Sequence, residues 1–91
     1  MPTISLASRL DLSQVAPLTA ELRSASGADL VIDASAVTLL GGLALQALAA
    51  AAVSARSAGT SLTITPRSDA FDDALAVFGL SPADIQTGEA A

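Results

Sequence analysis

The sequence predicts an α/β fold, a small sheet of about four mainly parallel strands flanked by three to four helices. Short apolar runs alternate with helical patterns in the order strand, helix, strand, helix, strand, helix. The run Leu30-Val31-Ile32 is continuously apolar and includes two β-branched residues, which is typical of a strand covered on both faces in a sheet flanked by helices. The segment 43–57 is rich in Ala and Leu, the strongest helix formers. Such alternation favours parallel strands joined by helical crossovers.

The beginning of the chain predicts one strand and one helix. Residues 3–6 alternate polar and apolar side chains, as a half-buried strand does. Asp11 and Ser13 are residue types that cap helices, and Pro17 is tolerated only near a first helical turn. We therefore expect a helix that begins close to Pro17 and ends at Ser26-Gly27.

The middle of the chain predicts a turn between two apolar segments. Residues 37–40 form a short apolar piece, either a strand extension or a buried turn, and Gly41-Gly42 breaks the pattern before the Ala/Leu-rich helix. Gly59 lies where a helix C-terminus is expected. Residues 62–64 predict a third strand, which Pro66 follows.

The last part of the chain predicts a short helix capped by Ser68 and closed by Gly79. A further helix start is expected at Ser81-Pro82, with proline at the first helical position. Three aromatic or aliphatic side chains should form the apolar face of the short helix, namely Phe71, Leu75 and Phe78. Three aspartates lie in its first turns, where their negative charges interact favourably with the helix dipole. They are Asp69, Asp72 and Asp73. We interpret these aspartates as a solvated helix start, because a metal site needs more converging ligands.

Length and composition predict one domain, 1–91, with frayed ends at 1–2 and 88–91. The chain contains no Cys, His, Lys, Tyr or Trp. This inventory removes disulfides, thiol nucleophiles, Cys/His zinc sites, histidine acid–base catalysis and Schiff bases. We therefore expect no enzyme, no metal and no cofactor.

The charge balance argues against two classes of partner. The formal net charge is −5, from 9 acidic and 4 basic residues, and all the basic residues are Arg. Nucleic acids and anionic membrane surfaces attract clustered Lys and Arg, so neither is an expected partner.

The stretch 34–55 carries no charged residue and is long enough to span a bilayer. Polar residues and Gly41-Gly42 interrupt it, and no aromatic belt or basic flank frames it. The N-terminus also lacks the basic and apolar regions of a signal peptide. We expect no direct membrane insertion and a cytoplasmic location.

Two further sites could carry chemistry. The free N–H groups at Gly41-Gly42 could hold an anion, present a helix end to a partner protein, or form only a structural turn. Asp33 ends a strand with Ser35 two residues later, and a metal or catalytic role is conceivable there. We favour a carboxylate that binds backbone N–H groups of its own turn.

The region 39–52 predicts a docking surface for a protein partner. Its helix has too few polar positions to cover an outer face, although Ala could serve helix propensity alone. An exposed apolar patch of this kind marks an interface. The residues expected to bind the partner are Asp11, Leu40, Gly41, Gly42, Leu43 and Gln46.

This succession of segments resembles the STAS domain family, which includes bacterial anti-sigma-factor antagonists and the cytosolic domains of sulphate transporters. The turn Leu-Gly-Gly-Leu before a Gln-containing helix is similar to short STAS proteins that accompany chemotaxis kinases. The segments that carry the resemblance are Leu10-Asp11, the run from Leu30 to Thr38, the helix after Gly41-Gly42, the run from Leu62 to Pro66 and the run from Ala74 to Leu80.

The chain departs from the family pattern at two places. Antagonists of the family carry Asp-Ser-Ser-Gly at the mouth of the second helix, and a partner kinase phosphorylates a serine there. The matching position here is Gly42, which has no hydroxyl, so the resemblance implies that this phosphorylation switch cannot operate. Relative to the family, the first strand is also expected to be missing, and residues 3–6 correspond to the strand before Leu10-Asp11.

Together these observations predict a non-catalytic protein–protein interaction module of bacterial regulation or signalling. Its partner would be a regulatory protein, either histidine-kinase-like or an ATPase component. Two alternatives stay open: an accessory regulatory subunit of a membrane transport ATPase, and an anion- or nucleotide-sensing domain.

Overall fold

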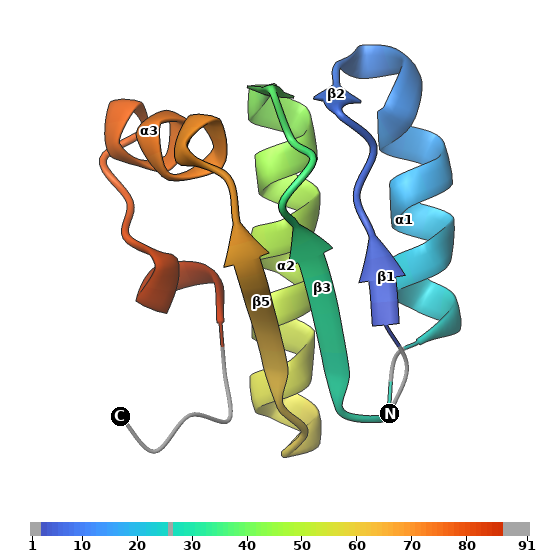
Figure 1. The fold of residues 1–91 in the computed structure, drawn as a ribbon. Coiled ribbons are helices and arrows are strands. Elements are labelled where there is room, and N and C mark those ends of the chain that lie inside the picture. The colour runs from blue at the N-terminus through green and yellow to red at the C-terminus, as the bar shows by residue number, and fades with distance from the viewer. Residues whose placement is uncertain (1–2, 26, 87–91) are drawn as a thin grey trace.

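The main sheet consists of parallel strands covered by helices on one face (Figure 1). The computed structural model describes residues 3–25 and 27–86, and within them the strands β1 (Thr3–Ser5), β3 (Leu30–Ala34) and β5 (Leu62–Arg67) lie in the order β1-β3-β5. The helices α1 (Val15–Ser24) and α2 (Gly42–Ala58) connect them and lie on the same side of the sheet. The predicted α/β fold with parallel strands is confirmed.

Side chains of the strands alternate between the core and the open face of the sheet. Ile4, Ile32 and Ile64 lie opposite one another in register, and all three are buried on the helix side. The neighbouring row is Thr3, Val31 and Thr63, which is exposed or half-buried. One face of the sheet therefore carries the core, and the expectation that the strand at 30–32 is covered on both faces is wrong.

A second, smaller sheet lies beyond the ends of β1 and β3 (Figure 1). The strands β2 (Arg9–Leu10) and β4 (Leu39–Leu40) pair in parallel, and the N–H of Gly41 donates to the Leu10 carbonyl, 2.9 Å away. The segment 37–40 thus combines the two predicted possibilities, because Val37 is a buried turn residue and β4 is a strand. The expected sheet of about four strands is divided into these two sheets.

Polar caps fix the shorter helices at this end. The 3-10 helix η1 (Leu12–Gln14) begins after Asp11, and α3 (Asp69–Val77) begins after Ser68. The Ser68 hydroxyl accepts from the Phe71 N–H and donates to the Val37 carbonyl, so it ties α3 to the turn after β3. The predicted start at Ser81-Pro82 is a 3-10 turn, η2 (Pro82–Ile85), closed by a capping box with Asp84.

Two boundaries differ from the prediction. Pro66 lies inside β5 rather than after it, because β5 is an edge strand and the missing N–H removes no bond of the ladder. Helix α1 ends at Ser24, and Gly27 follows with a φ of 87°. The expectations for Ser26 and for the frayed ends 1–2 and 88–91 concern positions outside the described residues.

One cluster of buried residues joins the sheet to α1, α2 and α3. Ile32, Leu48, Ile64 and Phe71 are completely buried within it. In α2, which has 17 residues, the buried positions face the sheet and Gly59 ends the helix with a φ of 73°. Among the residues that the structure describes, no helix combines the length and the apolar character needed to cross a bilayer.

Candidate functional site

Exposed apolar side chains gather at the end of the sheet to which the strands point. They come from η1, β4, the first turn of α2 and the end of α3, and α2 contacts η1 while α3 contacts β4. Leu43 is 52% exposed and Val77 is 83% exposed. We call this area the apical surface; it comprises Leu12, Leu39, Leu43, Val77 and Phe78.

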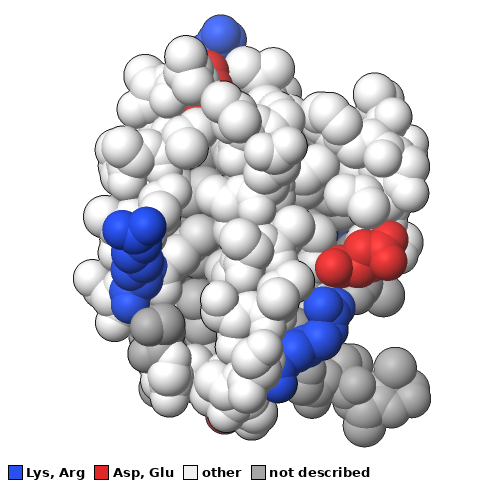
Figure 2. Space-filling model, turned by 180° about the vertical axis from the view of Figure 1, so that it is seen from behind, with Lys and Arg blue, Asp and Glu red and all other residues white. Residues whose placement is uncertain are grey.

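The side of the molecule that bears α1 and α2 carries few charges. Figure 2 shows that its central area is free of charged side chains, whereas basic and acidic side chains lie at the top, left and lower right of the view. The charged residue of α2 is Arg56, which lies in the last turn of the helix, far from its start. The apical surface therefore continues onto an uncharged helix face.

The beginning of α2 is held between β2 and the ring of Phe78. The N-cap residue, Gly41, has no side chain to bond the first N–H groups of the helix. A Cβ placed on Gly41 would lie 2.9 Å from the Leu10 carbonyl oxygen, whereas one on Gly42 would lie 3.6 Å from two ring carbons of Phe78. Glycine at position 41 thus permits the close approach of β2 to the start of α2.

The structure brings the predicted docking residues to this end of the molecule. Leu43 and Gln46 are exposed on α2, while Asp11, Gly41 and Gly42 are half-buried beside them.

The expectation that Leu40 lies at the rim of the docking surface is corrected. Leu40 is only 5% exposed and belongs to the core. Because successive side chains of β4 point to opposite sides, Leu39 takes the exposed position and Leu40 supports it from below.

Sequence reasoning missed most of the apical surface. Phe78 was expected on the buried face of the last helix, but α3 ends at Val77 and Phe78 is its C-cap, half exposed over Gly42. The signal available was Gly79, whose φ of 77° ends the helix directly after Phe78. Leu39 lies within the predicted region 39–52, whereas Leu12 gave no signal, because its exposure depends on how η1 packs.

Asp11 marks the polar rim of the apical surface. Its carboxylate accepts from the N–H and the hydroxyl of Ser13 and thereby caps η1. The hydroxyl bond is the main reason why the pKa of Asp11 lies below its ordinary value, with a smaller contribution from the positive charge of Arg9. The group is therefore negatively charged at neutral pH.

Asp33 forms the local turn that the sequence favoured over a catalytic role. Its carboxylate accepts from the N–H of Ser35 at 2.9 Å and from the Ser35 hydroxyl at 2.6 Å, and these bonds lower its pKa. In the acidic segment of α3, Asp72 pairs with Arg67 at 2.8 Å. Within the described part of the chain, no three acidic side chains converge as metal ligands would.

Comparison with known proteins identifies the family. No curated protein and no solved structure matches the chain. The model of a family described as "Mlab, STAS domain" matches residues 1–85, and these residues include both sheets, all the described helices and the apical surface. The resemblance seen in the sequence is thus confirmed, and the chain belongs to the STAS domain family.

Proposed function

We propose that this chain is a non-catalytic module of bacterial regulation or signalling that binds a regulatory protein through the apical surface. The observation that carries the proposal is that, of the six large apolar side chains found exposed among the described residues, five belong to the apical surface and only Val53 lies elsewhere. Water-exposed apolar area of this kind is stabilised when a partner covers it.

The arrangement of the apical surface suits docking. Gly42 is half-buried, with the Phe78 ring beside its Cα and the exposed Leu43 next to it in the chain, so a partner would meet an apolar surface made by these two side chains. Asp11 and the exposed amide of Gln46 supply polar contacts beside the apolar side chains, and such contacts orient a complex more than they strengthen it.

The nature of position 42 defines the kind of regulation. A family antagonist is released when phosphate is added to the serine at this position, whereas Gly42 offers no acceptor. We propose that binding is controlled by the partner, either a histidine-kinase-like protein or an ATPase component, rather than by phosphorylation at position 42. An accessory subunit of a transport ATPase would use the same surface.

A matched pair of substitutions on α2 tests this proposal. The tagged chain and its variants are used to isolate partners from source cells, and the dissociation constant of each purified partner is then measured. Leu43→Glu should weaken binding at least about tenfold, because it places a charge in an apolar contact. Val53→Glu is the control, since Val53 is 58% exposed on the same helix but about 15 Å further along it.

Comparison of the two variants distinguishes specific binding at the apical surface from nonspecific hydrophobic binding elsewhere on the chain. Val53→Glu should change the dissociation constant less than about twofold, as expected for a surface substitution outside the contact. Equal partner affinity for the wild type and Leu43→Glu would remove the apical surface as the binding site. Identification of the partner decides between the two proposed roles: a kinase-like partner indicates signalling, and a transporter ATPase indicates an accessory transport subunit.

A further inference from the structure

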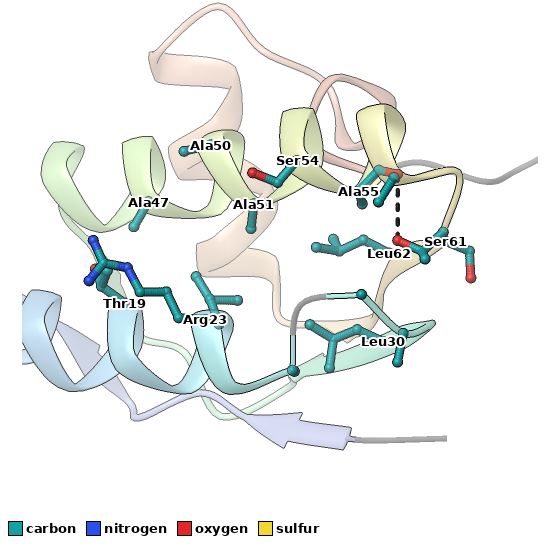
Figure 3. Close-up of a pocket in the computed structure, with 16 residues that line it drawn as sticks. Thr19, Arg23, Leu30, Ala47, Ala50, Ala51, Ser54, Ala55, Ser61 and Leu62 are labelled. Carbon is teal, nitrogen blue, oxygen red and sulfur yellow. Dashed lines mark hydrogen bonds between the residues drawn. The ribbon is translucent and has the colours of Figure 1, made fainter.

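A groove of about 560 Å³ lies between α1 and α2, at the end of the molecule opposite to the apical surface (Figure 3). The last turns of both helices form its walls, and the first residues of β3 and β5, Leu30 and Leu62, lie at its base. Its volume falls in the range of sites that hold small organic ligands, roughly 300–1,000 Å³.

The groove exists because α2 presents short side chains to α1. Ala47, Ala51, Ala55 and Ala58 recur at intervals of three or four residues and therefore share one face of the helix. Opposite them α1 contributes Leu22, and the space that larger residues would fill stays open. The alanine and leucine side chains of the groove therefore offer apolar surface to a ligand.

The mouth of the groove carries a single cationic side chain, Arg23. In Figure 3 this side chain extends from α1 toward Ala47, beside Thr19. Among the described residues no carboxylate lies within ion-pair distance of Arg23. Glu21, the nearest acidic residue in sequence, lines a different hollow beside β1.

The two ends of the groove differ in charge. Ser61 lies at the end away from Arg23 (Figure 3), and its N–H donates to the carboxylate of Asp29 at 2.9 Å. A negative ligand group is therefore attracted toward Arg23 and repelled from the Asp29 end. Between them the walls offer alanine and leucine side chains.

We propose that this groove binds an aliphatic monocarboxylate, with its carboxylate at Arg23 and its hydrocarbon chain along the alanines of α2. A guanidinium pairs with a carboxylate through two parallel hydrogen bonds, and one arginine balances one negative charge. This site is independent of the proposed docking function, because the apical surface lies at the other end of the helices.

Titration with octanoate, below the concentration at which it forms micelles, tests the site. Amide NMR should show saturable shifts at Ala47, Ala51 and Ala55, and the shifts give the dissociation constant. Octanol, which lacks the charge, should bind about fivefold more weakly, the upper range for the loss of an exposed ion pair. Absence of saturable shifts, or shifts confined to the apical surface, would overturn the proposal.

Two variants test the charge and the cavity separately. Arg23→Gln should weaken octanoate binding about fivefold, whereas the control Arg56→Gln should not, since Arg56 points to the Gln86 carbonyl instead. Ala51→Leu should abolish binding by filling the groove, with the fold verified by the NMR spectrum. Unchanged affinity in either Arg23→Gln or a folded Ala51→Leu variant refutes the assignment. Leu43→Glu should bind octanoate normally, which keeps this test separate from that of the docking surface.

Discussion

Asp11 directly follows β2 and Asp33 is the last residue but one of β3. Each carboxylate accepts two hydrogen bonds from the serine two residues later. The spacing Asp-x-Ser is what allows a short acidic side chain to reach both the N–H and the hydroxyl of one residue. Both bonds favour the ionised carboxylate, so the pKa of each aspartate lies below its ordinary value. These hydrogen bonds fix the turns beside the ends of β2 and β3.

Ser35→Ala should raise the pKa of Asp33 toward its ordinary value of 3.8, because the bond from the Ser35 hydroxyl is the largest cause of the lowered pKa. A carboxyl group with a lower pKa in the folded state than in the unfolded state stabilises the fold above the unfolded pKa. That stabilisation is lost as the pH falls through the folded-state pKa. When the pH is lowered from about 5 to below about 4, the free energy of unfolding should therefore fall less for the variant than for the wild type.

Carboxyl-carbon NMR titration and urea unfolding at each pH measure the two effects. Ser57→Ala is the control, since Ser57 is exposed on α2. An Asp33 titration curve that is identical in Ser35→Ala and the wild type would contradict the role assigned to the hydroxyl.

At the scale of elements, the junction of β4 and α2 decides where the helix begins. Gly41 donates its N–H to Leu10 and carries no Cβ, so the small sheet and the helix start lie in direct contact. Gly42 faces the Phe78 ring across an ordinary van der Waals distance. The two adjacent glycines therefore serve different purposes.

Substitution of each glycine by alanine should change stability in opposite directions. Gly41→Ala forces a Cβ against the Leu10 carbonyl oxygen, where only backbone can move, and should cost about 1–3 kcal/mol. Gly42→Ala fits the available space and restricts the unfolded chain, so it should stabilise by about 0.4–1 kcal/mol. The free energies of unfolding in urea measure both effects. A Gly41→Ala variant as stable as the wild type would contradict this prediction, because it would show that β2 can move away from the added Cβ at little cost in free energy.

The local elements could be predicted because their signals lie within a few residues. Local signals of this kind are the apolar run 30–32, the cap residue Ser68 and the terminal Gly59 and Gly79. They act through nearby backbone, and the strand, the cap and the helix ends lie where they were expected. The two-residue strands β2 and β4 could not be predicted in the same way, because they exist only through their mutual pairing.

The candidate site was predicted only in part, for the same physical reason. Leu43 and Gln46 follow from the helix pattern, but the burial of Leu40 depends on the direction in which β4 turns its side chains. The exposure of Phe78 depends on the end of α3, one residue earlier than the spacing of apolar residues indicates. The groove between α1 and α2 depends on the separation of two helices, which the many alanines permit but do not specify.

At the scale of the whole molecule, one core supports both surfaces. The cluster of buried residues extends from α1 through the sheet to α3, and Leu48 lies in it at the middle of α2. A chain of 91 residues has few other sources of stability, because small domains bury a modest share of their surface. The apical surface and the groove should therefore be lost together when the core opens.

Leu48→Ala tests this dependence. Leu48 is completely buried, and its truncation should cost about 2–5 kcal/mol, a large part of the 5–15 kcal/mol that stabilises a typical domain. Because one core joins all the elements, the far-ultraviolet circular dichroism of the helices and the NMR signals of β3 should disappear at the same urea concentration, in this variant as in the wild type. Val53→Ala, on the exposed face of the same helix, should change the free energy of unfolding by less than about 0.5 kcal/mol. Helix and sheet signals that vanish at different urea concentrations would show instead that α2 and the sheet unfold separately.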